Sequence, residues 1–430
     1  MRLKGPGKLG WVILGIAGLL ILEGAAPSPQ NGSEIPAISE RINAFTFDLL
    51  KHNAAGEKTA GNVILSAQSI FHGLAMSYVA SGGATRKELA SVLHFPDDDA
   101  QLIKYLSNLR RELMPAEKDK KLEVRMANAA WLDSTCFNFR EEYVDEIEKG
   151  FGAALRSAIF EKHEKEVSAD INKWVSENTR DRIQRVTSPG DLGAKPNGDF
   201  PVLVTVNAVY FKADWASKFD NGGTAKRPFH VDSAKTEDTL MMHQKSLLRY
   251  SEDEQLKFLE IPYIGGSYSM YIVLPKETLT VRQMMDLVTV DRITKLAQGT
   301  WEYSVDVLLP KFEMKSHVGV KDEISKMGVK SAFDRSSADF DKMIVKVNPL
   351  SRVYISEIYH DAWINVHEEG TEAAAATTTV HFGCSASAQP RLQLFHVDHP
   401  FLFLIVHNGS RSILFAGWIS RPSELALGGR

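Results

Sequence analysis

Histidines, serines and cysteines are the side chains of this 430-residue chain that could support hydrolytic or metal chemistry, and their spacing argues against both. None of the 13 histidines belongs to the His-Glu-x-x-His pattern of zinc proteases, and no Gly-x-Ser-x-Gly elbow is present. His396 and His399 could form a metal pair, but they lack acidic or cysteine partners at ligand spacing. We therefore expect no enzyme, no metal site and no cofactor.

A conformational function is indicated instead by residues 367–380, His-Glu-Glu-Gly-Thr-Glu-Ala-Ala-Ala-Ala-Thr-Thr-Thr-Val. An alanine helix is disfavoured by the glycine and the three consecutive threonines. A flexible linker is the other alternative, but strand-like segments stand on both sides. At the period of two that strands follow, one face is small and uncharged, and it consists of Thr371, Ala373, Ala375, Thr377 and Thr379. Such a strand can lie inside or outside a sheet, as a loop-insertion switch requires.

The elements around this segment must provide that sheet. Apolar residues at helical spacing predict helices over residues 38–51, 69–93 (interrupted at 81–83), 97–113 and 167–186. Short runs rich in Val, Ile, Phe and Tyr predict strands over residues 202–211, 259–263, 269–274, 305–309, 353–358, 401–407 and 412–419. Helices dominate the first half and strands the second, without a linker between them. This order indicates one α+β domain over residues 41–423, followed by a tail at 424–430.

The N-terminal residues 1–26 have the layout of a secretory signal peptide, with a positive start, an apolar stretch at 11–22 and small residues at 24–26. The apolar stretch is short of the roughly 20 residues that span a bilayer, so an uncleaved anchor is the weaker alternative. Residues 27–40 are expected to be a disordered lead-in. The mature protein is expected to be secreted and extracellular, or periplasmic if the source is a Gram-negative bacterium.

Composition limits the partners. The formal net charge of −4 gives no reason to expect nucleic acid or a membrane as partner. The two cysteines, Cys136 and Cys384, are expected to be free thiols, although the sequence also permits one bridge. Asn31 and Asn408 each begin an Asn-Gly-Ser glycosylation pattern, which matters only in a eukaryotic source.

Several motifs together resemble those of the serpin family of protease inhibitors, in family order and over nearly everything after Phe45. The departures are Ala67, where the family usually has Pro, and Ala213, where it usually has Gly. The motifs lie at Asn62–Ile70, Asn207–Phe219, Leu259–Tyr263, Leu309–Phe312, Glu368–Ala376, Phe395–Phe401 and Ile413–Gly417.

The resemblance implies a serpin fold, with three β-sheets, eight to nine helices and an exposed reactive-centre loop at about residues 368–390. It implies a hinge, a shutter beneath the central sheet and a breach where insertion begins, in which Lys311 pairs with Glu368. The hinge residues would be Glu368, Gly370, Thr371, Glu372, Ala373, Ala374, Ala375 and Ala376. The shutter would be Ser66, Ser69, Asn207 and His360, and the breach Trp215 and Lys311. The same residues would also suit a hydrogen-bonded core.

Counting from Glu368 at the family's inhibitory spacing places the scissile bond between Cys384 and Ser385, which suits elastase-like or subtilisin-like enzymes. A register shifted by two would present Phe382 to a chymotrypsin-like enzyme. Arg391 would suit a trypsin-like enzyme but lies too far from the hinge. The loop from Cys384 to Pro400 is several residues longer than the family usually allows.

The implied function is irreversible, suicide-substrate inhibition of serine endopeptidases by a monomer, with cysteine endopeptidases as a second target class. The rival is a non-inhibitory carrier or chaperone, whose hinge generally carries bulky, charged or proline residues. Glycosaminoglycan binding is left open, because acids interleave the basic residues near the helix that some serpins use for it. These are Lys104, Arg110, Arg111, Lys118, Lys120 and Lys121.

Overall fold

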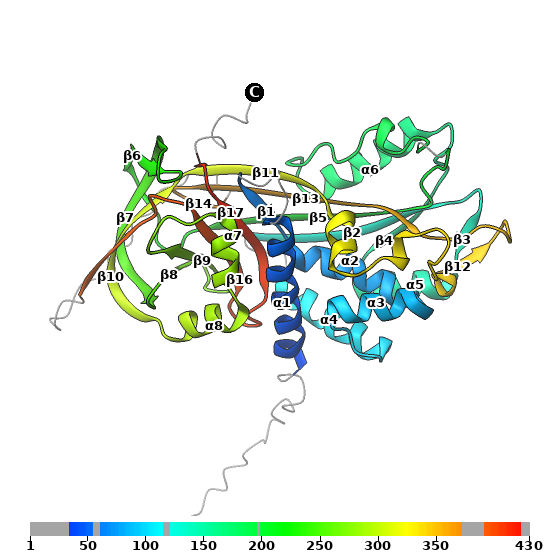
Figure 1. Ribbon diagram of the computed structural model, residues 1–430, viewed down its shortest axis with the longest axis horizontal. Helices are drawn as coiled ribbons and strands as arrows, with labels where there is room; N and C mark the ends of the chain where they lie inside the picture. The colour runs from blue at the N-terminus through cyan, green and yellow to red at the C-terminus, as the bar shows by residue number, and fades with distance from the viewer. Residues whose placement is uncertain (1–33, 55–60, 115–120, 196–197, 372–390, 423–430) are drawn as a thin grey trace, which may run out of the picture.

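The computed structural model describes residues 34–54, 61–114, 121–195, 198–371 and 391–422. Helices and strands in these ranges form one α+β arrangement (Figure 1). The helices of the described residues are α1 (Glu34–Ala54), α2 (Ala67–Ala80), α3 (Gly83–Leu93), α4 (Asp99–Leu113), α5 (Glu141–Phe151), α6 (Glu164–Asn178), α7 (Val281–Leu287), α8 (Val290–Gln298) and α9 (Val320–Met327). No helix among them is long and apolar enough to cross a membrane.

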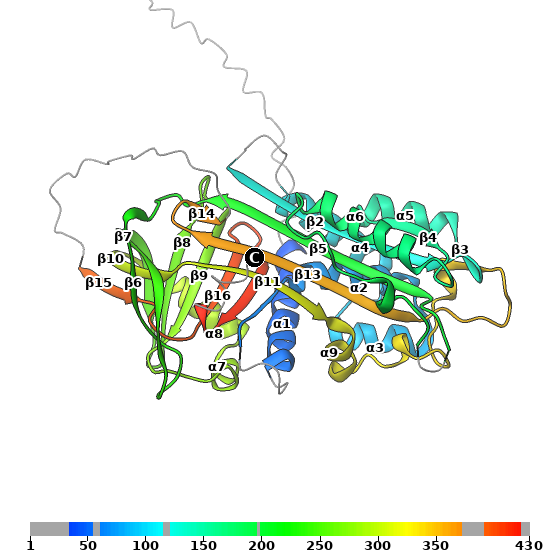
Figure 2. The ribbon, with the colours of Figure 1, turned by 90° about the horizontal axis from the view of Figure 1, so that it is seen from above.

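A six-stranded sheet extends along the length of the molecule (Figure 2). Its order is β11 (Phe312–Gly319), β13 (Ile355–His367), β14 (Gly370–Thr371), β5 (Leu203–Asp214), β2 (Leu122–Asp133) and β4 (Ala154–Ala158). Strands β13 and β5 also pair directly with each other, in parallel. A separate two-stranded sheet joins β12 (Ile344–Lys346) to β3 (Phe137–Phe139).

A nine-stranded sheet forms the other part of the fold. Its order is β1 (Val63–Leu65), β17 (Ile413–Ile419), β16 (Phe401–His407), β9 (Tyr268–Pro275), β8 (Leu256–Pro262), β7 (Thr236–Glu252), β10 (Trp301–Pro310) and β15 (Leu392–His396), with β6 (Asp220–His230) paired to β7. The α+β class with three sheets and eight to nine helices is thereby confirmed for the described part of the chain.

Strand β5 shows why the predicted central strand is apolar on both faces. Val204, Val206 and Ala208 belong to a core that includes Ile171 and Val175 of α6. The alternate residues Val209 and Phe211 belong to the main core, together with residues of α2. Because successive side chains of a strand point to opposite faces, covering both faces of the sheet requires an apolar residue at nearly every position.

Helix α2 lies between the two large sheets. Every one of its residues is buried, which is typical of a helix covered on all sides. It contacts β2 and β5 on one side and β17 on the other. This helix therefore forms the floor beneath the place where β13 and β5 meet.

Two predicted helix boundaries were wrong by four residues or more. The first helix begins at Glu34, so residues 34–40 of the expected disordered lead-in are helical, and Ile38 is buried in the core. The helix expected over 167–186 ends at Asn178, because Arg180 and Asp181 adopt left-handed backbone conformations that a helix cannot continue. Ile183 and Val186 still reach the core beneath α6 from the following turn, which explains their helix-like spacing.

Candidate functional site

The six-stranded sheet is closed along most of β13 and β5 and open at one end. The two strands pair directly from Ile355 and Leu203 up to Ala362 and Val209. Beyond that point β14 lies between them, with Thr371 opposite Val366 on one side and Ala213 on the other. The hinge predicted from sequence therefore already contributes two residues to the sheet, in antiparallel orientation to both neighbours (Figure 2).

Gly370 is required at this insertion point. A Cβ atom built on it would lie 2.1 Å from the carbonyl oxygen of Ala213, a distance that no real contact allows. The next residue, Thr371, is fully buried, and its hydroxyl lies 2.7 Å from the phenol oxygen of Tyr263. Burial raises the pKa of Tyr263, so the phenol stays protonated. Only a small side chain fits in the place of Thr371.

Trp215 fixes the turn that leads from β13 to β14. Its indole Nε1 donates to the carbonyl oxygen of His367 at 2.9 Å, and its backbone N–H donates to the carbonyl oxygen of Glu369 at 2.9 Å. The indole is 1% exposed and stacks on Tyr263, with ring centroids 4.4 Å apart. The predicted breach residue therefore holds the hinge backbone directly, in addition to anchoring the core.

The carboxylates of Glu368 and Glu369, at the start of the hinge, each form an ion pair with a lysine. Lys311 Nζ lies 2.9 Å from Glu368 Oε2, which confirms the predicted pair, and Thr224 donates to Glu368 Oε1 at 2.8 Å. Burial alone would raise the pKa of Glu368, but the hydrogen bonds from Lys311 and Thr224 outweigh it and lower the pKa. Glu369 is held by an ion pair with Lys218, which lowers its pKa as well.

A row of polar side chains crosses the sheet above α2. Asn207 of β5 is in register with His360 of β13 on one side and with Asn128 of β2 on the other. Asn207 Nδ2 donates to Asn128 Oδ1 at 2.6 Å, and the Ser69 hydroxyl donates to the same oxygen at 3.4 Å. His360 Nε2 accepts from the backbone N–H of Ser66 at 3.1 Å. The four predicted shutter residues are therefore brought together.

The cluster is buried and its fit to α2 is close. Ser66 also donates from its hydroxyl to the carbonyl oxygen of Leu414 on β17, at 2.6 Å. A Cβ atom on Gly73 of α2 would lie 2.4 Å from Asn207 Nδ2, so the helix backbone must stay bare there. Ser66 and Ser69, at the start of α2, thus form hydrogen bonds to both large sheets. A separation of β13 from β5 must rearrange these hydrogen bonds.

Sequence reasoning missed several members of these clusters. Asn128 accepts from two of the predicted residues, and the signal for it was a single asparagine within the alanine-rich run 127–130. Thr224 and Lys218 bind the hinge carboxylates from 144 and 151 residues away in the chain. No local pattern marks such partners.

Several predicted positions fall outside the described residues. These are the bond between Cys384 and Ser385, the hinge residues Glu372, Ala373, Ala374, Ala375 and Ala376, the alternative Phe382, and the N-terminal segment with Asn31. Arg391 is described and exposed.

Cys136 is a free thiol. Asn408 donates through its amide nitrogen to Gly266 O at 2.8 Å and to Ser269 Oγ at 3.0 Å, so in this structure the acceptor nitrogen is already engaged.

His396 and His399 have separate partners. His396 Nε2 lies 3.3 Å from Asp306, whereas His399 Nδ1 lies 2.7 Å from Asp398. Within the described ranges, no group of three His, Cys, Asp or Glu side chains is arranged to hold a metal ion.

Of the basic residues near α4, Lys104, Arg111 and Lys121 are exposed. Arg110 is half-buried, with its guanidinium packed where a Cβ atom on Gly152 would lie.

The fold and this site define a protein whose central sheet is open at one end, where Gly370 and Thr371 lie between two strands that otherwise pair directly. A family model described as serpin (serine protease inhibitor) matches residues 40–422, and the chain belongs to this family. The leukocyte elastase inhibitor of Xenopus laevis is 33% identical over 392 residues, which cover 90% of this chain and 99% of that protein.

Solved structures agree with this assignment. Native protease nexin-1 with heparin superposes with a TM-score of 0.77 at 28% identity, covering 90% of this chain and all of that one (100%). Serpin48 of the insect Tenebrio molitor superposes with a TM-score of 0.76 at 28% identity, covering 90% of this chain and 98% of that one.

Proposed function

We propose that this serpin inhibits serine endopeptidases irreversibly, as a suicide substrate, by inserting its cleaved loop between β13 and β5. The protease serine attacks the scissile carbonyl and forms an ester, and the new amino end of the chain leaves. The hinge then extends β14 through the sheet and carries the esterified protease away from the insertion point. Deacylation fails because the displaced protease loses the geometry of its active site.

The position of Gly370 and Thr371 is the observation that carries this proposal. Their pairing with both β13 and β5 sets a register in which every further residue has a defined place. Continued along β5, Thr377 would face Asn207, and continued along β13 it would face His360. The two extrapolations agree, and Asn207 and His360 are already register partners. Once β13 and β5 have moved apart, a strand can therefore enter opposite residues 357–362 of β13 without a change of register in either neighbour.

The same register supports the predicted scissile bond. Residue 381 would face Leu203, the first residue of β5, and residue 382 would face Ile355, the first residue of β13. An inserted strand over 370–381 would be roughly 40 Å long at ~3.3 Å per residue. Cys384 would follow just past the end of the sheet, whereas Arg391 would be left far beyond it. We therefore favour cleavage between Cys384 and Ser385, by an elastase-like or subtilisin-like enzyme.

We also propose that the protein is secreted after removal of residues 1–26, on the strength of the signal-peptide layout. Edman sequencing of protein purified from the culture medium of cells that express the full chain would test this. An N-terminus near Pro27 is expected. Retention of the intact chain in the cell membrane would contradict it.

The inhibition experiment mixes the purified protein with neutrophil elastase, chymotrypsin, subtilisin, trypsin and papain. Each mixture is run on a denaturing gel, and the released peptide is identified by mass spectrometry. A denaturant-stable complex and a peptide that begins at Ser385 are expected for at least one serine protease. Cleavage within the loop while every protease stays active would contradict inhibition and favour the carrier or chaperone alternative.

A further inference from the structure

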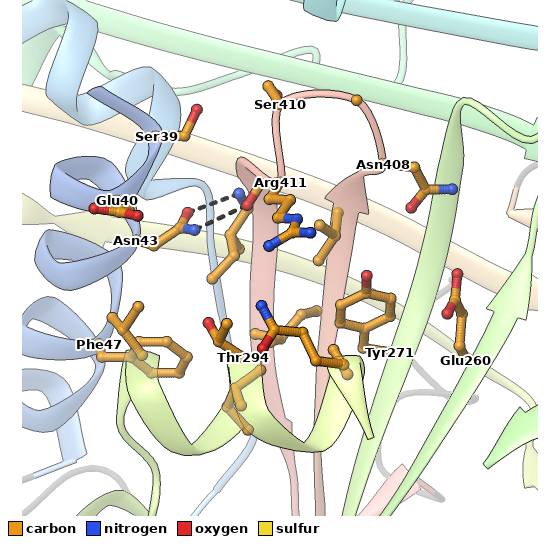
Figure 3. Close-up of a pocket in the computed structure, with 18 of the residues that line it drawn as sticks. Ser39, Glu40, Asn43, Phe47, Glu260, Tyr271, Thr294, Asn408, Ser410 and Arg411 are labelled. Atoms are coloured by element: carbon orange, nitrogen blue, oxygen red, sulfur yellow. Dashed lines mark hydrogen bonds between the residues drawn. The ribbon is translucent and has the colours of Figure 1, made fainter. Parts of the chain in front are cut away.

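Residues 345–350, called the distal segment below, lie at the end of the molecule away from the hinge. All six residues are exposed, and three of them carry aliphatic side chains. These are Val345, Val347 and Leu350, whose exposed fractions are 48%, 54% and 92%. By contrast, Phe47 and Leu404 line a recessed cavity of about 740 Å³ (Figure 3), which the surface of another protein cannot enter. The distal segment projects outward, so its aliphatic side chains can contact a globular partner (Figure 1).

The backbone of the distal segment is held in place by its neighbours. Ile344, which precedes the segment, is buried in the main core and anchors β12 there. The N–H of Val347 donates to Cys136 O at 2.8 Å, next to β3. The N–H of Leu350 donates to Asn348 Oδ1 at 3.1 Å. The aliphatic side chains are therefore presented on an anchored turn.

The distal segment adjoins the end of the six-stranded sheet at which an inserted strand would leave it. Asp133, the last residue of β2, donates its N–H at 2.9 Å to Val202 O, just before β5. Ile355, the first residue of β13, follows Leu350 by five residues, which span at most about 18 Å. Figure 1 shows β12 and β3 at the opposite end of the molecule from β14.

We propose that the distal segment contacts the acylated protease after loop insertion. This contact presupposes the proposed inhibitory function, in which residue 382 comes to lie beside Ile355 and the protease stays attached to Cys384. Two further residues reach at most about 7 Å, whereas a protease domain of about 200 residues has a radius of gyration of roughly 16 Å. A body of that size on so short a tether occupies the space around Ile355, into which the distal segment projects.

The partner surface is the apolar surface that a protease exposes when its active site is distorted, because loss of tertiary packing uncovers hydrophobic side chains. Val345, Val347 and Leu350 bury part of that surface and stabilise the distorted protease relative to the ordered one. Hydrolysis of the ester requires the ordered active site. In that reaction water frees the protease serine and leaves a carboxylate on Cys384. The contact therefore slows the release of active protease.

The first experiment measures release from the finished complex. A triple variant, Val345→Ser with Val347→Ser and Leu350→Ser, is compared with the wild type. The matched control is Leu247→Ser, because that leucine is 62% exposed but lies on β7 of the other large sheet. We expect all three proteins to form the denaturant-stable complex with the same stoichiometry, since neither site belongs to the hinge.

Complexes purified by gel filtration are then incubated with a fluorogenic substrate of the protease. Protease activity should return about tenfold faster from the triple variant than from the wild type, because the burial of three aliphatic side chains is lost. It should return at the wild-type rate from Leu247→Ser. Circular-dichroism melting shows that each variant is folded before it is compared.

The second experiment detects the contact directly, with a photoreactive benzoylphenylalanine in place of Leu350. Irradiation should join this side chain to the protease in the acylated complex. It should not join it to a protease whose catalytic serine is replaced by alanine, which binds the loop without acylation. Equal release from the triple variant and the wild type, or an acylated complex without the cross-link, would overturn the contact and leave the proposed function intact. A wild type that forms no denaturant-stable complex would overturn both.

Discussion

The hydroxyl of Thr371 lies 2.7 Å from the phenol oxygen of Tyr263, and the ring of Tyr263 stacks on Trp215. Through this contact the second residue of β14 is joined to the indole that holds the hinge turn. Gly370 and Thr371 are therefore already paired in the sheet. In the proposed mechanism, insertion would begin from these fixed residues and not from a free end.

Substitution Thr371→Arg should convert the inhibitor into a substrate. The guanidinium would have to be buried beside Tyr263 without a charged partner, which is strongly unfavourable. We expect the denaturant-stable complex to disappear while cleavage within the loop continues, as measured on denaturing gels. Thr371→Val is the matched control, because it keeps the shape and removes only the hydroxyl. Complex formation by Thr371→Arg at the wild-type level would exclude insertion through this point.

The ion pair of Lys311 and Glu368 should make hinge anchoring dependent on pH. The folded state lowers the pKa of Glu368 from its usual 4.5, so the stabilisation is complete above that pH and is lost as the pH falls through the lowered pKa. Lys311→Met should therefore lower the melting temperature at about pH 7, and the difference from wild type should shrink at about pH 3. The pair of Lys218 and Glu369 is untouched by this change. An equal difference at both pH values would show that Lys311 acts through packing alone.

Asn128 should contribute to stability as strongly as the shutter residues that sequence analysis identified. Asn128→Ala removes the 2.6 Å acceptor of Asn207 and leaves a buried amide with only a 3.5 Å contact to Ser69 O. Loss of such a buried partner costs about 1–3 kcal/mol. The midpoint of the first unfolding transition in guanidinium should fall accordingly. Asn138→Ala, an exposed asparagine on β3, is the control and should have little effect. Equal midpoints for the two variants would show that the cluster is not stabilising.

In the proposed inserted state, the register of β14 continued along the sheet would place Thr377 between Asn207 and His360. Thr377→Asp should raise the number of inhibitor molecules consumed for each protease inactivated. Burial of a carboxylate in the shutter would slow insertion, so deacylation would release the protease more often. Thr377→Val is the isosteric control and should inhibit nearly as well as wild type. Titration of protease activity against inhibitor concentration measures both. An unchanged stoichiometry for Thr377→Asp would show that the inserted register is different.

Local patterns predicted much of the fold. The interruption at 81–83 separates α2 from α3, and the apolar run at 202–211 became β5. Strand β2 was missed because Arg125 and Asn128 interrupt its apolar pattern, and pairing with β5 and β4 stabilises it instead. Strand β6 was missed because most of its residues are exposed, so no buried face marks the sequence.

The candidate site was predictable where a motif names the residue and unpredictable where only tertiary structure does. Thr371 was singled out by its small, uncharged side chain, and Gly370 by the hinge motif that the family resemblance implied. Their docking between two strands depends on where β5 and β13 diverge, which no local window contains. The same is true of Tyr263, which lies 108 residues from Thr371 in the chain.

Gly370 and Thr371 of β14 also affect whether a strand of the same molecule or one from a neighbouring copy can be added to the sheet. The positions beside β5 and β13 are occupied by the molecule's own Gly370 and Thr371. A strand donated by a neighbouring copy must therefore displace these two residues or pair further along β5 and β13. Self-completion is unimolecular, whereas donation by a neighbour depends on concentration. Under the proposed mechanism, the two positions already filled would favour insertion of each molecule's own strand, and a destabilised hinge would favour strand exchange and polymers.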